Sequence, residues 1–199
     1  MVVEKDLICI SDEIYEYYLY GNHRHVSIAS FDEEIKKRTF VVNGTSKSYS
    51  MTGLRIGYLA GDAEVVKKIG ILQDHSTSNP TSISQKMAVA ALALPKSYHE
   101  DVRNIFQKRS LLMTELLSKA KGFLPFKAEG AFYVFCDISG TKILSETLCE
   151  RLLEEIHVAV IPGKSFGSDS HVRFSFATGE KDIQEGLQRI IQWTEKNIK

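Results

Sequence analysis

The feature that most constrains this chain is the segment from Thr39 to Asp62, TFVVNGTSKSYSMTGLRIGYLAGD. Two apolar stretches of strand type, TFVV and RIGYLAG, flank a polar turn that is punctuated by glycine and contains Lys47. The pattern raises the question of why one lysine stands in a polar turn between two buried strands.

The composition is that of an ordinary globular protein and excludes several classes of function. The chain has 199 residues, enough for one large domain or two small ones, with 43% hydrophobic and 25% charged residues. Its formal net charge of zero gives no reason to expect nucleic acid or an anionic membrane as a partner. No apolar run approaches the roughly 18 residues that span a bilayer. The N-terminus, MVVEKDL, lacks a signal-peptide hydrophobic region, so we expect a cytoplasmic protein.

The three cysteines also fit a reducing cytoplasm, because they show no sign of pairing in disulfides. Cys9, Cys136 and Cys149 are far apart, odd in number and without metal-ligand spacing, and each lies in an apolar context. We expect buried free thiols and no metal site.

The first part of the chain alternates strand and helix signals. A buried strand is expected in DLICIS, and a helix in AEVVKKIGILQDH, where Val65, Val66, Ile69 and Leu72 recur at helical spacing. A second helix follows in SISQKMAVAALAL, with Ser82 or Ser84 as its N-cap, and Pro95 ends it. The long amphipathic helix after Pro95 is expected to stop at Gly122.

The last part has the character of an α+β unit. Strands are expected in GAFYVFCDIS, HVAVIPG and HVRFSFA, and helices in ILSETLCERLLEEI and KDIQEGLQRIIQWTEKNI. We therefore predict an α/β protein with three parts: 1–95, belonging to a large domain with a mainly parallel sheet; 96–122, a connecting helix; and 123–199, a small α+β domain.

The chemistry around Lys47 suits pyridoxal phosphate. A lysine amine becomes nucleophilic when its pKa falls, and Arg55 is a candidate for the second cation that would lower it. Thr45, Ser46 and Ser48 offer hydroxyls that could bind a phosphate, and Arg55 could bind one with two N–H groups. A solvated turn lysine beside a surface arginine is the alternative interpretation.

Two further positions fit the same cofactor. Asp12 follows a strand, and Tyr15 comes three residues later, where one helical turn would put both side chains on one side. A buried carboxylate keeps a pyridine nitrogen protonated, and a phenol can bond the ring's 3-oxygen. A helix cap at Asp12 and simple packing by Tyr15 would explain the same residues.

Arg173 lies within HVRFSFA, where Val172, Phe174 and Phe176 alternate on one strand face. A guanidinium on a rigid strand suits two-pronged binding of a carboxylate. An ordinary outward-facing arginine on a half-buried strand is the alternative.

Five segments of the chain resemble the class I/II aminotransferases of pyridoxal-phosphate fold type I. They occur in the same order as in that family and cover essentially the whole chain: SDEIY, NGTSKSYSMTGLRIGY, EGAFYVF, VIPGKSFG and HVRFSFATGEKDIQEGLQRI. The resemblance implies that Lys47 forms a Schiff base with the cofactor, that Asp12 pairs with the pyridinium nitrogen, and that Tyr15 bonds the 3-oxygen. It also implies that Ser46 and Arg55 bind the phosphate and that Arg173 binds the substrate α-carboxylate.

The same resemblance implies transfer of an amino group from an amino acid to a 2-oxo acid, in a homodimer. It aligns the chain with the C-terminal half of such enzymes, so the family's glycine-rich phosphate loop and stacking aromatic residue have no counterpart here. A sheet shortened in this way is expected to leave an unpaired edge and an uncovered apolar face.

Other functions share these residues. A β-lyase or a cyclopropane-carboxylate synthase uses the same lysine and carboxylate, so the fold alone does not decide between them. The aminotransferase-like sensor domain of a transcription regulator is a different class. It would need a basic DNA-binding module, which this neutral chain does not show.

Overall fold

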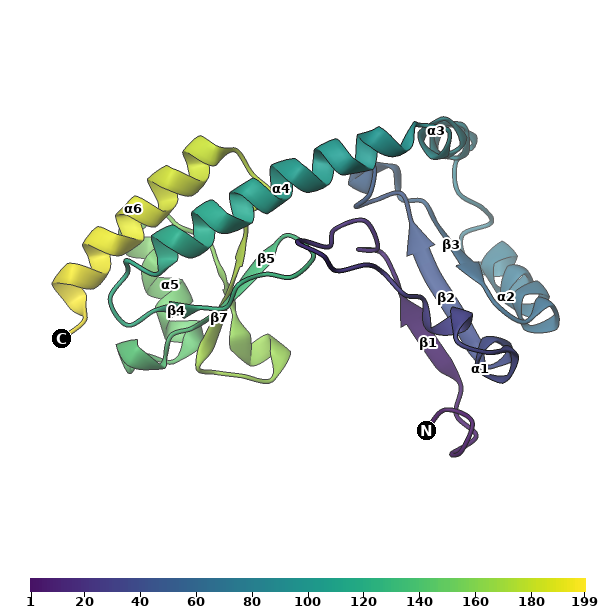
Figure 1. The fold of residues 1–199 in the computed structure, drawn as a ribbon, viewed down its shortest axis with the longest axis horizontal. Helices are drawn as coiled ribbons and strands as arrows, with labels where there is room; N and C mark the ends of the chain where they lie inside the picture. The colour runs from purple at the N-terminus through teal and green to yellow at the C-terminus, as the bar shows by residue number, and fades with distance from the viewer. The chain divides into compact units, whose positions relative to one another are not determined.

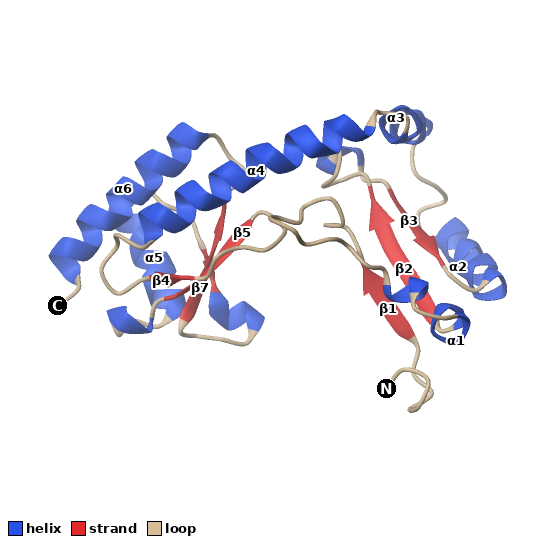
Figure 2. Ribbon diagram, viewed as in Figure 1, coloured by secondary structure: helices blue, strands red, loops and turns tan.

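The computed structural model describes all 199 residues and divides into two compact units, Met1–Glu100 and Asp101–Lys199. Each unit has a sheet of its own (Figures 1 and 2). The division falls inside the longest helix, α4 (Lys96–Leu117), which begins in the first unit and continues in the second. None of the helices has the length and apolar character that a bilayer crossing requires.

The first unit is built on a three-stranded sheet of order β1-β2-β3, formed by β1 (Cys9–Asp12), β2 (Thr39–Gly44) and β3 (Gly57–Ala60). β1 and β2 are parallel, whereas β2 and β3 are antiparallel. The prediction of a mainly parallel sheet therefore holds for only one of these two pairings. The connection from β2 to β3 holds the Lys47 turn and one short 3-10 helix (Thr52–Leu54) in place of the α-helix that usually makes a parallel crossover, and the chain returns antiparallel to β2.

Three helices accompany this sheet: α1 (Glu33–Lys37), α2 (Ala63–Ser76) and α3 (Ser82–Leu92). An N-cap side chain begins each of them, because Asp32, Asp62 and Thr81 accept hydrogen bonds from backbone N–H groups of the first turn. The prediction of Ser82 or Ser84 as the cap of α3 is wrong. Thr81 occupies that position, and Ser84 donates its backbone N–H to the Thr81 hydroxyl at 3.2 Å.

Much of the apolar surface of the first unit is exposed. The helical spacing in α2 is confirmed, but the helix buries no residue, and Leu72 is 70% exposed. On β1, which was predicted to be a buried strand, Ile10 is 74% exposed and Cys9 only half-buried. The physical reason is that none of this chain's own elements covers these side chains.

The second unit contains a four-stranded antiparallel sheet of order β4-β5-β7-β6. Its strands and helices are β4 (Leu124–Pro125), β5 (Tyr133–Asp137), α5 (Ser145–Ile156), β6 (Ile161–Pro162), β7 (His171–Ser175) and α6 (Glu180–Asn197). The strand expected in HVAVIPG is reduced to the two residues of β6, and the short β4 was not foreseen. The helix α4 ends at Leu117 rather than near Gly122, which adopts a positive φ of 83° in the loop that follows.

A compact core fills the second unit. The inward face of β5 and β7 meets one face each of α5 and α6, and the buried residues include Val134, Cys136, Leu148, Leu152, Val172, Phe174, Leu187, Ile190 and Trp193. Burial of apolar area at about 25 cal/mol per Å² is the main stabilising term here. Cys136 and Cys149 are buried free thiols, as predicted, and burial raises the pKa of Cys136 to about 12.

This core gives a paired stability prediction for two glycines of the second unit. A Cβ on the buried Gly163 would lie 2.3 Å from the carbonyl oxygen of His171 and 2.4 Å from that of Ser168. Gly163→Ala should therefore lower the free energy of unfolding by about 1–3 kcal/mol. Gly186 lies within α6 and has open space around it, so Gly186→Ala should raise that free energy by about 0.5–1 kcal/mol.

Urea unfolding followed by the fluorescence of Trp193, the single tryptophan, measures both effects in the second unit. Equal stability of the two variants would contradict the close backbone approach at Gly163.

Candidate functional site

The pairing of the first sheet brings three predicted site residues to one edge. Asp12 ends β1 and is paired in parallel register with Val42 of β2, so the chain leaves both strands at the same edge. Lys47 lies three residues beyond the end of β2. Because β3 is antiparallel, Gly44 is paired with Gly57, and Arg55 lies two residues before that point. Asp12, Lys47 and Arg55 therefore belong to segments that meet at one sheet edge.

The backbone approach at this edge is close. A Cβ on Gly57 would lie 2.9 Å from the carbonyl oxygen of Asn43, and one on Gly44 would lie 3.0 Å from the Cα of Gly57. A larger residue at either position would push β2 and β3 apart. Gly44 and Gly57 thus allow β2 and β3 to stay close up to the point where the Lys47 turn begins.

The turn that contains Lys47 is closed by backbone hydrogen bonds. The N–H groups of Tyr49, Ser50 and Met51 donate to the carbonyl oxygens of Thr45, Lys47 and Ser46 respectively, each at 3.1 Å. Ser50 adopts a positive φ of 54°, which ends the turn. Lys47 is half-buried within it.

Two hydroxyls beside Lys47 are buried without a hydrogen-bond partner. Thr45 is 3% exposed and Ser48 is 2% exposed, and neither Thr45 Oγ1 nor Ser48 Oγ is bonded to any group. A buried polar group without a partner costs about 1–3 kcal/mol. Such groups are unusual in a folded protein and mark places where a bound polar ligand would supply the partner. The donor set around Lys47 thus fits an anionic, hydrogen-bonding cofactor.

The predicted phosphate ligands are placed differently from one another. Ser46 is half-buried in the lysine turn. Arg55 is exposed, has a positive φ of 50°, and donates one hydrogen bond of 2.8 Å to the carbonyl oxygen of Thr52. Most of its N–H donors remain available at the sheet edge, as binding of a phosphate requires.

Asp12 departs from the expectation of a buried carboxylate. It is exposed, and its Oδ1 accepts a hydrogen bond of 3.2 Å from the backbone N–H of Ile14. The reason is that Asp12 is the last residue of an edge strand whose side chains alternate between half-buried and exposed. Tyr15 is half-buried, and its ring lies edge-to-face with that of Tyr18 at 6.4 Å.

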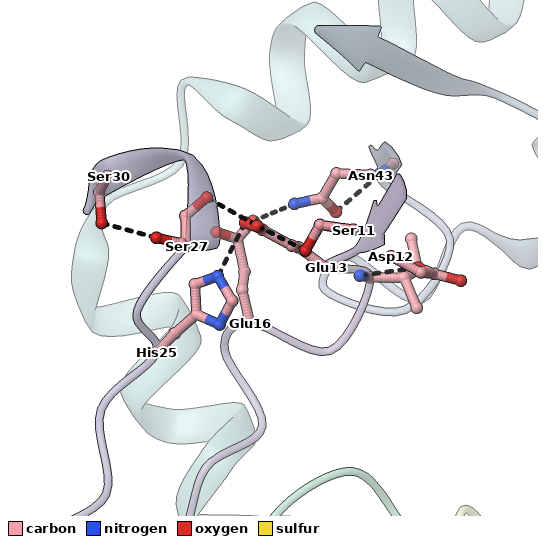
Figure 3. A network of polar contacts seen from close by, with 10 residues as sticks. Ser11, Asp12, Glu13, Glu16, His25, Ser27, Ser30 and Asn43 are labelled. Atoms are coloured by element: carbon pink, nitrogen blue, oxygen red, sulfur yellow. Dashed lines mark hydrogen bonds and ion pairs between the residues drawn. The ribbon is translucent and has the colours of Figure 1, made fainter. Parts of the chain in front are cut away.

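A polar network beside Asp12 was not foreseen from the sequence (Figure 3). The carboxylate of Glu13, only 7% exposed, accepts hydrogen bonds from Ser27 at 2.6 Å and Ser11 at 3.0 Å, and lies 2.8 Å from Nε2 of His25. Burial disfavours the charged form, but these hydrogen bonds outweigh it and hold the pKa of Glu13 below its usual value. The network ties the residue next to Asp12 to the loop before β2.

A cluster of aromatic rings, also not foreseen, surrounds the start of α4. The ring of His99 stacks on Tyr17 at 3.7 Å and contacts Tyr49 edge-on at 4.9 Å, and its Nε2 lies 3.2 Å from the Tyr49 hydroxyl. Tyr98 stacks on Tyr49 at 5.9 Å. Burial lowers the pKa of His99, which favours the neutral imidazole. Since Tyr49 is two residues beyond Lys47, the cluster supports the lysine turn.

Arg173 lies in the second unit, on β7, as the alternating pattern predicted. Val172 and Phe174 are buried on one face of the strand, and Arg173 projects from the other. Its guanidinium carbon lies 4.3 Å from the ring centroid of Tyr133 and 4.5 Å from that of Phe166. These ring contacts use none of its N–H donors, which form no hydrogen bond or ion pair within the chain. The structure therefore holds Arg173 by stacking and leaves its donors for a ligand.

The fold defines a class: pyridoxal-phosphate enzymes of fold type I, whose aminotransferases are the structural neighbours. Residues 1–190 match the family model of aminotransferase class I and II. The chain therefore belongs to the class I and II aminotransferase family, which depends on pyridoxal phosphate.

Curated relatives agree with this assignment. The chain is 43% identical over 201 residues to an aspartate aminotransferase of Bacillus subtilis, covering 98% of this chain and 51% of that protein. It is 46% identical over 193 residues to a probable aspartate/prephenate aminotransferase of Aquifex aeolicus, covering 94% and 49%. The chain thus spans about half the length of the curated relatives that it matches.

Solved structures show the same relationship. The aspartate aminotransferase of Rhizobium meliloti superimposes with a TM-score of 0.94 at 34% identity, over 100% of this chain and 52% of that one. The aromatic aminotransferase of Pyrococcus horikoshii gives a TM-score of 0.92 at 36% identity, over 98% and 53%.

The Glu13 network gives a prediction with a defined pH dependence. Because folding lowers the pKa of Glu13, its stabilising contribution is complete above the ordinary glutamate value of 4.5 and is lost as the pH falls through the lower folded-state value. Glu13→Gln should cost about 1–3 kcal/mol of unfolding free energy at pH 7, and the difference from the parent should shrink below pH 4.5.

Urea unfolding followed by circular dichroism across this pH range measures the difference. Glu33→Gln, on the exposed first turn of α1, is the matched control and should stay within about 0.5 kcal/mol of the parent. A gap between Glu13→Gln and the parent that is independent of pH would contradict the assignment.

Proposed function

We propose that this chain carries the lysine and the carboxylate-binding arginine of a pyridoxal-phosphate-dependent aminotransferase, which transfers an amino group from an amino acid to a 2-oxo acid. One observation carries the proposal. The register of the first sheet brings Asp12, the Lys47 turn and Arg55 to one edge, where two buried hydroxyls lack partners.

The proposed roles follow from the chemistry of each side chain. Lys47 would bind the aldehyde of the cofactor through Nζ and, once displaced by the substrate amine, would move the proton between the substrate α-carbon and the C4′ carbon. Asp12 would pair with the protonated ring nitrogen, and Tyr15 would hydrogen-bond the 3-oxygen. The cofactor, when bound, supplies the electron sink for this proton movement.

The phosphate would be held by the hydroxyl of Ser46 and the guanidinium of Arg55, with Thr45 and Ser48 as further hydroxyls at the same turn. Arg173 would bind the α-carboxylate of both the amino acid and the oxo acid. A two-pronged contact from a guanidinium fixes the direction of the carboxylate as well as its charge.

The names of the relatives guide the choice of substrate. Several are named as aspartate or as aspartate/prephenate aminotransferases, so aspartate with 2-oxoglutarate is the first pair to assay. These names favour amino-group transfer over the β-lyase, synthase and sensor functions that share the same lysine. A homodimer remains the proposed assembly, by analogy with the family.

Covalent labelling tests the proposed function directly. Borohydride reduction of the full-length protein with pyridoxal phosphate, followed by peptide mapping, should place a pyridoxyl group on Lys47. Lys67 and Lys68, on the exposed helix α2, serve as internal controls and should stay unlabelled. A pyridoxyl group at another lysine in place of Lys47 would refute the assignment.

Arg173→Ala separates substrate binding from cofactor binding. Removing one partner of a desolvated charge pair costs about 2–5 kcal/mol, and each 1.4 kcal/mol is about a factor of ten. The KM for amino acid and oxo acid should therefore rise roughly 30-fold to several thousand-fold, with the absorption spectrum of the bound cofactor unchanged. Arg173→Lys should recover only part of this loss, because an ammonium cannot form the two-pronged contact.

The exposed Arg189 provides a control in the same unit, since its side chain makes a single 3.4 Å hydrogen bond to the carbonyl oxygen of Ile156. Arg189→Ala should leave both KM values as they are. Unaltered KM values in Arg173→Ala would show that Arg173 is structural.

A further inference from the structure

Tyr18 connects the segment that carries Asp12 and Tyr15 to the turn that carries Lys47. It lies three residues beyond Tyr15 and is only 2% exposed. Its hydroxyl donates a hydrogen bond of 2.7 Å to the backbone carbonyl oxygen of Lys47, 29 residues later in the sequence. The bond thus joins two segments that the proposed function assigns to the same cofactor.

The Lys47 carbonyl oxygen accepts two hydrogen bonds, one from Tyr18 and one of 3.1 Å from the backbone N–H of Ser50. A carbonyl oxygen has two lone pairs, so both are occupied. Two donors from different parts of the chain fix the peptide plane that follows Lys47. That plane and the Cα–Cβ bond of Lys47 share the Cα atom. The two hydrogen bonds therefore also restrict the position of the Lys47 Cβ, from which the side chain extends.

The Tyr18 hydroxyl keeps its proton near neutral pH and therefore remains a hydrogen-bond donor. Burial, with a smaller contribution from Tyr98, raises the pKa of Tyr18 to about 12. The phenol therefore stays protonated and continues to donate wherever an aminotransferase is assayed.

Two further hydrogen bonds join the same segments before the lysine turn. The backbone N–H of Glu13 donates to the carbonyl oxygen of Val42 at 2.9 Å, and the Asn43 side chain donates to Glu16 at 2.8 Å (Figure 3). Beyond them, the stacked rings of Tyr17, His99 and Tyr49 pack the turn. Stacked rings can shift relative to one another at little cost. A hydrogen bond to the Lys47 carbonyl oxygen has a preferred distance and angle, and so restricts the position of the lysine backbone.

We propose that Tyr18 is a positioning residue for Lys47: its hydroxyl fixes the lysine backbone relative to the segment bearing Asp12 and Tyr15. The role rests on the proposed function, in which all three residues meet one cofactor. It adds a specific requirement: the placement of the Lys47 amine for the cofactor aldehyde would depend on a hydroxyl that is bonded to the lysine backbone.

Tyr18→Phe is the test, because it removes the hydroxyl and keeps the buried ring. Tyr98→Phe is the matched control, since the Tyr98 ring stacks on Tyr49 and its hydroxyl forms no hydrogen bond within the chain. Both variants of the full-length protein should keep the parent circular dichroism spectrum.

The first measurement needs no cofactor. Amide hydrogen exchange at Ser48–Met51 should be roughly two- to tenfold faster in Tyr18→Phe than in the parent, the effect of losing one hydrogen bond. Exchange in Tyr98→Phe should match the parent. Unchanged exchange in Tyr18→Phe would overturn the proposal, because the bond would then not restrain the turn.

The second measurement distinguishes a misplaced Lys47 from a general loss of the cofactor-binding site. The rate at which pyridoxal phosphate attaches to the protein, followed by absorbance, should fall roughly two- to tenfold in Tyr18→Phe. Affinity for pyridoxine phosphate, which lacks the aldehyde, should stay at the parent value, because the ring and phosphate contacts are intact. An unchanged attachment rate, or a parallel loss of analogue affinity, would overturn the positioning role.

Failure of the proposed function is distinguishable from failure of this inference. If the parent protein is labelled at a lysine other than Lys47, the proposed function fails before any substitution is made, and the positioning role fails with it. If Lys47 is labelled but Tyr18→Phe attaches the cofactor at the parent rate, only the role of Tyr18 is lost.

Discussion

The parallel pairing of β1 with β2, from Cys9 with Thr39 to Asp12 with Val42, is the constraint on which the candidate site depends. Two parallel strands end at the same sheet edge, so the residues after each strand must be neighbours. The short antiparallel return through β3 then brings Arg55 back to that edge. An antiparallel β1 would have placed Asp12 at the opposite edge from Lys47, and no local rearrangement could have compensated.

The polar groups near this edge fall into two kinds. The Glu13 carboxylate is buried and surrounded by donors from Ser11, His25 and Ser27, which is how a structural charge is stabilised. The hydroxyls of Thr45 and Ser48 are equally buried but have no partner. Satisfied groups hold the framework, and unsatisfied groups beside Lys47 keep a cost that a bound ligand would remove.

Local features of the fold could be predicted from the sequence because they depend on residues close together in the chain. The periodicity of α2, α4 and α6 and the alternation of β7 are of this kind. The cap of α3 was misplaced because several hydroxyl residues stand in a row, and only the backbone conformation of Thr81 selects it. The antiparallel turn into β3 was missed because strand direction is set by the connection and not by the strand residues.

The site was harder to predict, because its supporting contacts join distant residues. Nothing in the local sequence around Tyr18 points to a partner at Lys47, and the same holds for Glu13 with His25 and for Arg173 with Phe166. The expectation of a buried Asp12 failed for a related reason. Burial depends on what packs over a strand, and no element of this chain covers the end of β1.

The two units differ in what holds them together, and this difference bears on Lys47. The second unit encloses an apolar core between its sheet and helices, whereas the first leaves Ile10, Leu72 and Ile83 largely exposed. The lysine turn nevertheless does not depend on those apolar side chains. It is closed by its own backbone hydrogen bonds, tethered by the buried hydroxyl of Tyr18 and packed by the ring of His99 through Tyr49. Because the hydrogen bonds among these contacts are short-range and directional, they can fix the lysine backbone even where hydrophobic burial is sparse.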